Sequence, residues 1–301
     1  MENTLIVVVG PTGVGKSAIS LKLAQHYHTE IISADSRQIY KELSIGTAVP
    51  PPNDLQIVKH HLIQTISVSN YYNASMFEIE VLEKLGELYK TKNPLIMTGG
   101  SMLYLDAVCK GIDDLPTVDK DIRDRLIEEF EQDGIEAIRL QLKHLDPEYY
   151  EKVDLKNPKR LLHALEICLM TGKTYTSFRS KTIKERPFRI IKIGLNMERE
   201  KLYDRINQRV LQMVEEGLFE EARSVYHLRE LNSLNTVGYK EIFAHFSGTI
   251  TREEAIEQIQ NNSRKYARKQ LTWFRKDKEI NWFTPDQFEE ICQFLNSELK
   301  S

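Results

Sequence analysis

The chain has 301 residues, of which 41% are hydrophobic and 28% are charged, so it can bury the core of one large domain or two modest ones, which argues against a mainly disordered chain. Its net charge of -3 argues weakly against nucleic acid as a partner, because phosphate binding relies on Lys and Arg. No run approaches the roughly 18 to 20 apolar residues of a membrane span and the start lacks the features of a signal peptide, so we expect a cytoplasmic protein.

The N-terminal part of the chain alternates short buried strands with amphipathic helices. Residues 5–9 form a wholly apolar, β-branched run, which is typical of a central strand in a parallel sheet. Apolar residues at helical spacing follow at 17–27 and 77–89, and further strands are expected at 30–33 and 94–97. This order predicts an open α/β sheet, whose ligands gather at the carboxyl ends of the strands. The loops at those ends are 10–17, 34–38 and 98–102.

The middle of the chain has a different character. A long acidic helical stretch at 119–134 is followed by more helical spacing as far as Met170. A strand pattern returns at 189–195 and can rejoin the first sheet. We therefore predict an inserted helical domain. It spans 113–188 and interrupts a core of 1–112 and 189–301.

The strongest chemical signal lies directly after the first strand. The sequence there matches the P-loop motif G-x-x-x-x-G-K-[ST] and lies between a strand and a helix, as the motif requires. Its backbone N–H groups can surround a di- or triphosphate, while Lys16 supplies positive charge and the Ser17 hydroxyl can bind Mg²⁺. The predicted fold class is therefore α/β, with a P-loop nucleoside-triphosphate-hydrolase-like parallel sheet and an inserted helical subdomain. The predicted diphosphate- or nucleotide-binding residues are Gly10, Pro11, Thr12, Gly13, Val14, Gly15, Lys16 and Ser17.

A P-loop by itself first suggests a kinase or another ATP-binding enzyme. Such enzymes carry an acid at the end of a hydrophobic strand to hold Mg²⁺, but the strand at 94–97 is followed by Thr-Gly-Gly-Ser. The acid at a predicted strand end is Asp35. Its neighbours Ser36, Arg37 and Gln38 suit polar recognition. A helix N-cap is an alternative role for Asp35.

Two basic segments run against the acidic average. Residues 156–192 contain ten Lys or Arg against two acids. A second cluster interleaves cations with aromatic rings, a mixture that single-stranded RNA favours. Its members are Arg264, Lys265, Tyr266, Arg268, Lys269, Trp273, Phe274, Arg275 and Lys276. A solvated helix face with core aromatics is the alternative for each segment.

An ordered series of motifs along nearly the whole chain resembles the tRNA dimethylallyltransferases, also called tRNA isopentenyltransferases, of the bacterial type. The matching segments include 10–17, 34–40, 45–48, 60–63, 98–104, 157–160, 204–209, 237–241 and 264–275. The resemblance implies transfer of a dimethylallyl group from dimethylallyl diphosphate to the exocyclic amine of the adenosine 3′ of the anticodon. It also implies Mg²⁺, release of diphosphate and an inserted domain that grips the anticodon stem-loop of tRNA. No protein partner and no membrane contact are inferred.

The predicted catalytic residues are Asp35, Lys16, Ser17 and Arg209. Because diphosphate is the leaving group in this reaction, the P-loop would stabilise the negative charge that develops as the carbon–oxygen bond breaks. The resemblance places Arg209 on the same diphosphate, where a guanidinium can bridge two oxygens; a surface salt bridge is its alternative role. The acceptor amine must lose a proton, which makes Asp35 the candidate general base.

The adenosine must leave the stack of its loop to react, so a flipped base in a channel is implied. The predicted tRNA-binding residues are Asp35, Ser36, Arg37, Gln38, Ser101, Arg123, Asn157, Pro158, Lys159, Arg160, Leu161, Arg264, Arg268 and Arg275. An intrahelical pair with Asp119, or with an acid near Asp124, is the alternative for Arg123. One departure from the family is Met102, which stands where members usually carry Gly and would strain the loop if that position needed a positive φ.

The cysteines and the paired histidines do not indicate a metal centre. The three cysteines are far apart in sequence and form no Cys-x-x-Cys pair, so neither a disulfide framework nor a zinc site is expected. His60 and His61 are adjacent and point apart if the chain is extended, which favours packing roles.

Three other functions fit part of the sequence. A transferase that prenylates a small adenylate would share the P-loop, but it needs no RNA grip, and the basic segments argue against it. A P-loop kinase of small metabolites would share the loop and the fold. A non-catalytic RNA-binding protein would explain the basic segments but leave the P-loop and Asp35 without a role.

Overall fold

A computed structural model describes residues 2–113, 115–116, 119–179 and 183–300. The chain divides into two compact units. Unit 1 comprises Met1–Lys110 and Glu185–Ser301, and unit 2 comprises Gly111–Lys184. The sequence prediction placed the inserted domain at 113–188.

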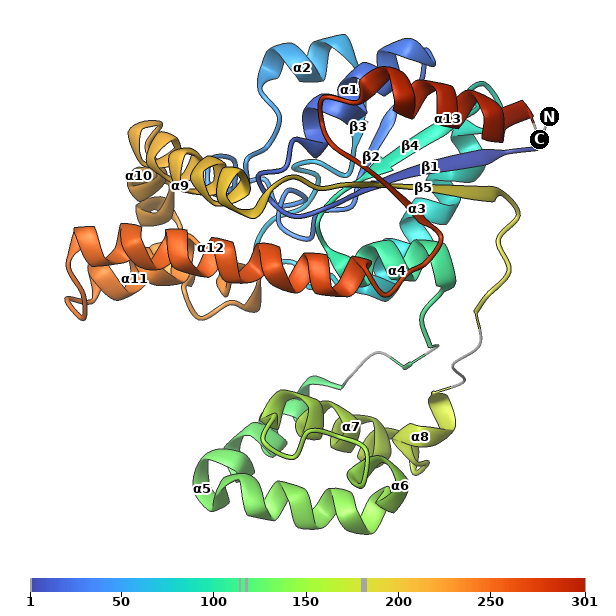
Figure 1. Cartoon of the computed structure of the whole chain (residues 1–301). Helices are drawn as coiled ribbons and strands as arrows, with labels where there is room; N and C mark the ends of the chain where they lie inside the picture. The colour runs from blue at the N-terminus through green and yellow to red at the C-terminus, as the bar shows by residue number, and fades with distance from the viewer. Residues whose placement is uncertain (1, 114, 117–118, 180–182, 301) are drawn as a thin grey trace. The chain divides into compact units, whose positions relative to one another are not determined.

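Unit 1 is built on a six-stranded sheet in which all neighbouring strands are parallel (Figure 1). The strand order is β3-β2-β4-β1-β5-β6. The strands are β1 (Thr4–Val9), β2 (Ile31–Ser33), β3 (His60–His61), β4 (Leu95–Thr98), β5 (Arg189–Leu195) and β6 (Ile280–Phe283). Since β1 and β5 pair directly, the prediction that the strand at 189–195 rejoins the first sheet is confirmed.

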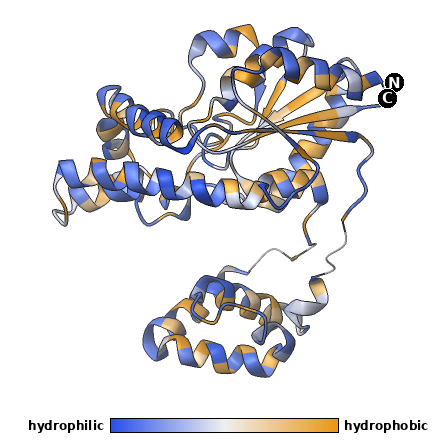
Figure 2. Cartoon of the chain, viewed as in Figure 1, coloured by the Kyte–Doolittle hydropathy of each residue, from blue (hydrophilic) through white to orange (hydrophobic). Residues whose placement is uncertain are grey.

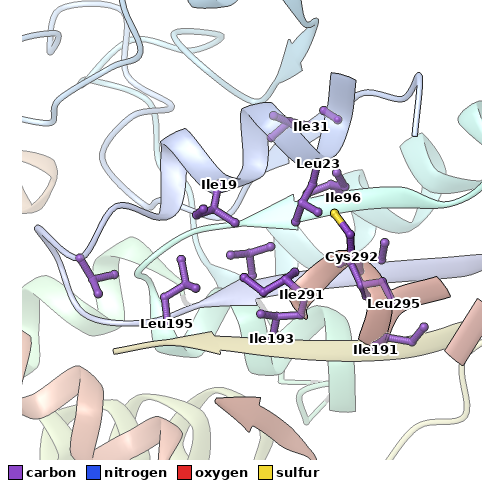
Figure 3. Close-up of a cluster of buried hydrophobic side chains, with 14 of the residues drawn as sticks. Ile19, Leu23, Ile31, Ile96, Ile191, Ile193, Leu195, Ile291, Cys292 and Leu295 are labelled. Carbon is purple, nitrogen blue, oxygen red and sulfur yellow. The ribbon is translucent and has the colours of Figure 1, made fainter. Parts of the chain in front are cut away.

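Apolar, mostly β-branched side chains make β1 suitable for the centre of the sheet (Figure 2). Helices α1 (Lys16–His26) and α13 (Phe288–Lys300) contribute apolar side chains to one core cluster with β4 and β5. Figure 3 shows these side chains, among them Ile19, Leu23, Ile96, Ile193 and Ile291. This packing fixes the direction of α1 and therefore the position of the loop before it.

The register of the sheet brings three loops to one edge. Thr98 of β4 is the register partner of Val8 in β1 and of Ser33 in β2, so the three strands end at the same level. The loops at 10–17, 34–38 and 98–102 follow these strand ends. Their meeting at the carboxyl edge of the sheet is the geometry in which α/β proteins bind ligands.

The remaining helices of unit 1 flank this edge and the sheet. They are α2 (Pro52–Ile57), α3 (Ala74–Leu88), α4 (Met102–Lys110), α9 (Arg199–Glu215), α10 (Leu218–Ser224), α11 (Tyr239–Phe246) and α12 (Arg252–Phe274). Two short 3-10 segments lie at Tyr226–Leu228 and Asn232–Leu234. Apolar residues of α9 to α12 form a second core with residues 39–43 and Val68. In Figure 1 the long α12 runs alongside α11.

The described residues of unit 2 form helices and loops and no strand. Its helices are α5 (Lys120–Leu145), α6 (Pro147–Tyr150), α7 (Pro158–Thr171) and α8 (Tyr175–Phe178). Helix α5 is broken at Gly134, which has φ 75°. Asp146 ties α6 to α8, because its carboxylate accepts hydrogen bonds from the backbone N–H and the hydroxyl of Thr176 at 2.7 and 2.9 Å. The core of unit 2 packs α5 against α7.

The fold class predicted from the sequence is confirmed, and two strands were not predicted. β3 consists of two histidines and β6 is only partly buried, so neither shows the buried apolar run that marks the other strands. Across the described ranges of the chain, no helix is both long and apolar enough to cross a membrane.

Candidate active site

The three loops at the carboxyl edge surround two neighbouring cavities of about 100 and 350 Å³. Lys16, Ser17 and His60 line the smaller cavity only. Ser36, Arg37 and Ser101 line the larger one only. Thr12, Asp35, Thr47, Arg209 and Tyr266 line both. The predicted phosphate-binding and base-recognition groups therefore border one continuous region.

The P-loop needs its glycines for two physical reasons. Gly10, Gly13 and Gly15 all have positive φ, a conformation that other residues rarely adopt. A Cβ on Gly10 would lie 2.5 Å from the main-chain oxygen of Leu195, and one on Gly13 would lie 2.9 Å from the Ile206 side chain. The loop is thus held tightly against β5 and α9, with its backbone turned around the smaller cavity.

Lys16 folds back onto its own loop. Its Nζ donates hydrogen bonds to the main-chain oxygens of Gly10 and Pro11 at 3.0 and 2.9 Å. Burial, and to a lesser extent the positive charge of Arg209, lower the pKa of Lys16 to about 8, although the Asp35 carboxylate acts in the opposite direction. An anion that enters the cavity would therefore stabilise the positive charge of Lys16.

Arg209 projects from α9 toward the same region. No described residue forms a hydrogen bond or an ion pair with its guanidinium. Burial lowers the pKa of Arg209 below its usual range, partly offset by Asp35. The surface salt bridge considered for Arg209 is therefore absent from the described part of the chain. Lys16 and Arg209 both line the smaller cavity, and neither forms an ion pair with a described carboxylate, which makes an anion-binding arrangement.

Asp35 follows β2 and caps the turn at residues 36–39, where the structure has no helix. Its Oδ1 accepts hydrogen bonds from the backbone N–H groups of Arg37 and Gln38 at 2.9 and 3.3 Å, as a capping residue does. No described residue donates to its Oδ2. One oxygen therefore fixes the side chain, and the carboxylate lines both cavities with the other oxygen uncommitted.

Ser101 joins the loop after β4 to the loop after β2. Its hydroxyl oxygen accepts a hydrogen bond from Ser36 N at 2.7 Å and donates to Ser36 Oγ at 3.1 Å. Met102 begins α4 and does not have a positive φ, so the strain considered for this position does not arise. Gly99 is the tight point of this loop, because a Cβ there would lie 2.1 Å from the main-chain oxygen of Ala34.

The Gln38 side chain forms its hydrogen bonds within the protein. Its Oε1 accepts from Ser33 Oγ at 2.9 Å, and its Nε2 donates to the main-chain oxygens of Thr47 and Ala48 at 3.1 and 2.9 Å. Gln38 therefore braces the segment at 47–48 against β2. Gln38 lines the smaller cavity and Arg37 the larger one.

Two residues on α12 contact the loops of the site in a way that was not predicted from the sequence. Gln270 is 1% exposed; its Oε1 accepts from Thr12 N at 2.8 Å and its Nε2 donates to the main-chain oxygen of Gly100 at 2.8 Å. The hydroxyl of Tyr266 donates to the same oxygen at 3.3 Å. The two residues are four apart on one helix face. Tyr266 was predicted only as an aromatic ring of the basic cluster, and Gln270 was not singled out. They clamp the P-loop to the loop after β4.

The larger cavity also has an apolar side. Its apolar lining comes mainly from α9 and from the segments before α11 and within α12. These residues are Ile206, Val210, Met213, Leu218, Val237 and Ile259. The region therefore offers positive charge at one end and hydrocarbon along its wall.

The predicted RNA-binding residues of unit 2 divide into exposed and structural groups. Lys159 and Arg160 are exposed near the start of α7, where Asn157 is the N-cap and Pro158 the first helical residue. Leu161 is fully buried in the core of unit 2, so its side chain offers no surface to RNA.

Arg123 is held by a residue that its sequence neighbourhood does not reveal. It bonds the buried Glu166 through two nitrogens at 2.6 and 2.9 Å, rather than Asp119 or an acid near Asp124. His163 contacts the same carboxylate at 3.3 Å. The two bonds between Arg123 and Glu166 connect α5 to α7.

The two basic segments divide in the same way. On α12, Arg268 is exposed and Arg275 lies exposed at its C-cap, whereas Arg264 hydrogen-bonds the side chains of Asn207 and Asn261. In the segment at 156–192, three cations of unit 1 are paired with carboxylates. These are Arg186 with Glu78, Arg189 with Glu298, and Lys192 with Asp277 and Glu279. Lys181 of that segment lies outside the described residues.

The adjacent histidines make separate contacts. His61 Nε2 lies 2.7 Å from Glu30 Oε2, while His60 Nδ1 lies 2.8 Å from the main-chain oxygen of Val58. Burial lowers the pKa of His60. Within the described residues, no group of three His, Cys, Asp or Glu side chains could hold a metal ion by itself.

Comparisons with known proteins agree on one family. A model described as IPP transferase matches residues 38–277. tRNA dimethylallyltransferase 1 of Phocaeicola vulgatus is 58% identical over 297 residues, with 99% of both chains covered. The corresponding protein of Bacteroides fragilis is 57% identical over 297 residues, again with 99% of each covered.

Solved structures give the same result. The full-length tRNA isopentenylpyrophosphate transferase of Bacillus halodurans is 35% identical with a TM-score of 0.73, over 100% of this chain and 97% of its own. A eukaryotic dimethylallyltransferase solved while acting on tRNA is 26% identical with a TM-score of 0.74, over 90% of this chain and 69% of its own.

Proposed function

Because the chain belongs to the IPP transferase family, we propose that it transfers a dimethylallyl group from dimethylallyl diphosphate to tRNA and releases diphosphate. The acceptor in this proposal is the exocyclic amine of the adenosine 3′ of the anticodon. The observation that carries the proposal is the convergence of the P-loop, Lys16 and Arg209 on one cavity edge without a carboxylate partner for either cation among the described residues.

Those two cations suit a diphosphate leaving group. As the bond between C1 of the prenyl group and the diphosphate oxygen breaks, negative charge develops on that oxygen. Preorganised cations and backbone N–H groups lower the energy of this charge without further reorganisation. Gln270 supports the arrangement, since it holds Thr12 of the P-loop against the loop after β4.

The apolar wall of the larger cavity suits the five-carbon group. Met213, Val237 and Ile259 can bury its methyl groups, at about 25 cal/mol per Å² of apolar surface removed from water. Exclusion of water also protects the electron-poor carbon from hydrolysis.

Asp35 is proposed to take the proton that the acceptor amine loses. The amine nitrogen forms a bond to C1, the carbon–oxygen bond breaks, diphosphate leaves with the bonding electrons, and the proton passes to Asp35. The contacts to its Oδ1 orient the carboxylate and leave Oδ2 uncommitted among the described residues.

Mg²⁺ is proposed to accompany the diphosphate. The residues present fit such an ion, because Mg²⁺ is commonly held by few protein oxygens together with phosphate oxygens and water. Ser17 would supply a hydroxyl oxygen at the smaller cavity. The ion would offset the charge on the diphosphate oxygens. Chelation of divalent metal should then abolish transfer, and added Mg²⁺ should restore it.

The exposed cations are proposed to bind tRNA. Lys159 and Arg160 of unit 2, with Arg268 and Arg275 of unit 1, offer charge to the phosphate backbone. Ser36 and Arg37 border the larger cavity, where the flipped adenosine would enter. Ser101 acts there through its hydrogen bonds to Ser36.

The test is an assay of radiolabelled dimethylallyl diphosphate with unmodified tRNA, AMP and ATP as separate acceptors. The proposal predicts label in tRNA only, and none in a tRNA whose adenosine 3′ of the anticodon is replaced by guanosine. Label in AMP or ATP would favour a small-molecule transferase. Phosphoryl transfer from ATP without prenyl transfer would favour a kinase, and RNA binding without any transfer would favour a binding protein.

A further inference from the structure

One carboxylate outside both cavities gathers three consecutive backbone N–H groups. Glu221, on α10, accepts hydrogen bonds at Oε2 from Ser44 N and Ile45 N, both at 2.8 Å. Its Oε1 accepts from Gly46 N at 2.9 Å. A charged acceptor that binds three amides holds a loop more firmly than the same number of neutral contacts.

Tyr239 completes this arrangement from α11. It is 0% exposed, and its hydroxyl donates to Glu221 Oε1 at 2.5 Å. Burial, together with the nearby Glu221 carboxylate, raises the pKa of Tyr239, so the phenol remains a donor. Gly46 lies directly against the ring, because a Cβ there would be 2.6 Å from the Tyr239 hydroxyl. The loop at 44–46 is therefore fixed both by hydrogen bonds and by contact.

The fixed loop leads straight into the site. Gly46, Thr47 and Ala48 line the larger cavity. The main-chain oxygens of Thr47 and Ala48 accept the Gln38 side-chain amide, and Gln38 N donates to Asp35 Oδ1. Hydrogen bonds, together with the main chain at 46–48 and Gln38 itself, thus connect Glu221 to the proposed general base.

We propose that Glu221 and Tyr239 are positioning residues for prenyl transfer, which hold the 46–48 wall of the larger cavity and, through Gln38, the Asp35 carboxylate. Neither side chain lines a cavity in the described structure, so both act through other residues. This inference rests on the proposed function. It assigns a geometric role in the chemical step, where a displacement of about 1 Å can cost roughly 100-fold in rate.

The main test is Glu221→Gln. The variant keeps the size of the side chain but replaces one acceptor oxygen with an NH₂ group, which cannot accept from a backbone N–H. We expect kcat to fall about tenfold, a change of about 1.4 kcal/mol in the activation barrier. The KM for dimethylallyl diphosphate should stay within about twofold, because Lys16 and Arg209 are untouched. Hydrogen exchange at the amides of residues 44–46 should accelerate.

Tyr239→Phe removes only the hydroxyl and provides a graded companion. The three backbone N–H groups keep their acceptor, so we expect a smaller fall in kcat, of about threefold. The double variant should fall less than the product of the two single effects, because both changes loosen the same loop.

Glu42→Gln is the matched control. Glu42 also anchors a loop, since its carboxylate accepts from Val68 N at 2.9 Å and from the Ser67 hydroxyl at 2.6 Å. It lines neither of the two cavities. Its replacement should lower the melting temperature but leave kcat within about twofold of the unmodified enzyme.

The outcomes separate the possibilities. A selective loss of kcat in Glu221→Gln, with a retained KM and a normal Glu42→Gln variant, supports the positioning role. If Glu221→Gln melts earlier but keeps its kcat, or if Glu42→Gln loses as much kcat, Glu221 is structural and the inference is overturned. If the unmodified enzyme transfers no prenyl group to tRNA, the proposed function fails first and the inference fails with it.

Discussion

Two lysines of unit 1, Lys16 at the start of α1 and Lys192 in β5, have opposite electrostatic surroundings. Lys192, in β5, lies 2.8 Å from Asp277 and 2.6 Å from Glu279. Burial lowers the pKa of Lys192, but its hydrogen bonds to the two carboxylates outweigh this and raise it above the usual value. Lys16 donates only to main-chain oxygens, and burial lowers its pKa to about 8. The charge of Lys192 is neutralised by two carboxylates of the protein, whereas Lys16 forms no ion pair with a described carboxylate.

The difference indicates where a ligand belongs. A buried charge without a counter-charge is costly, and a protein that retains one needs a compensating partner. In this chain the uncompensated cations, Lys16 and Arg209, lie together at the carboxyl edge of the sheet. The compensated ones hold elements together elsewhere. Charge counts alone cannot make this distinction, because Lys192 belongs to the segment that looked most basic in sequence.

The largest effect is expected at Asp35, whose carboxylate lines the same cavity as Lys16 and Arg209. Asp35→Asn keeps the size of the side chain and an acceptor for the backbone contacts, but removes the proton acceptor. Transfer should therefore fall about 100- to 10,000-fold at saturating substrates, with tRNA affinity and melting temperature little changed. Near-normal turnover would rule out Asp35 as the base and leave it as a capping residue.

The comparison itself is tested by two matched substitutions. Lys16→Met should reduce prenyl transfer by about 100-fold or more, without lowering the melting temperature of the unliganded protein, because no ion pair is broken. Lys192→Met should do the reverse. It should cost about 3 kcal/mol of stability by leaving Asp277 poorly compensated, and it should spare kcat. Steady-state kinetics and thermal melting on both variants decide between these patterns.

The lowered pKa of Lys16 predicts a pH dependence of ligand binding. Bound diphosphate favours the charged amine, so affinity should weaken as the pH rises through about 8, by at most tenfold per pH unit. Calorimetric titrations at several pH values should reveal this step in the unmodified protein. A step that persists in Lys16→Met would belong to another group, such as the diphosphate itself.

The same pKa has a consequence for stability with the opposite sign. Its folded value of about 8 lies below the usual lysine pKa of 10.5, so the unfolded chain binds more protons between those two pH values. The contribution of Lys16 to the stability of the unliganded protein should therefore increase as the pH rises through this window. Lys16→Met should lack that contribution.

The smallest effects are expected at the exposed cations. Each phosphate contact removed should reduce the log–log salt slope of tRNA binding by about 0.7 to 0.9. Lys159→Ala and Arg268→Ala are the test variants, and Arg189→Ala, whose partner is Glu298, is the control. Unchanged slopes in both test variants would mean that these exposed residues do not contact RNA.

Much of the site could be predicted because it depends on local sequence. The P-loop is a contiguous motif, and Asp35 follows a recognisable strand, so the parallel order of the sheet brings them together. Contacts between segments that are distant in sequence could not be predicted in this way. Gln270 reaches Thr12 across 258 positions, and Arg123 reaches Glu166 across 43. No periodic signal in a single sequence encodes such pairings.

The role of a cation also depended on tertiary structure. Arg264 and Arg268 lie four positions apart on α12, yet Arg264 is held by two asparagines and Arg268 is exposed. Helical spacing predicts which residues share a face, but the elements that pack against that face decide which side chains remain available to a ligand.

The most direct test of the account is a calorimetric titration of inorganic diphosphate at pH 7 into the unmodified protein, Lys16→Met and Lys192→Met. We expect the unmodified protein and Lys192→Met to bind diphosphate with the same affinity. Lys16→Met should bind it at least about tenfold more weakly. Equal affinity in all three proteins would contradict the account, because the uncompensated lysine would then have no part in binding the anion.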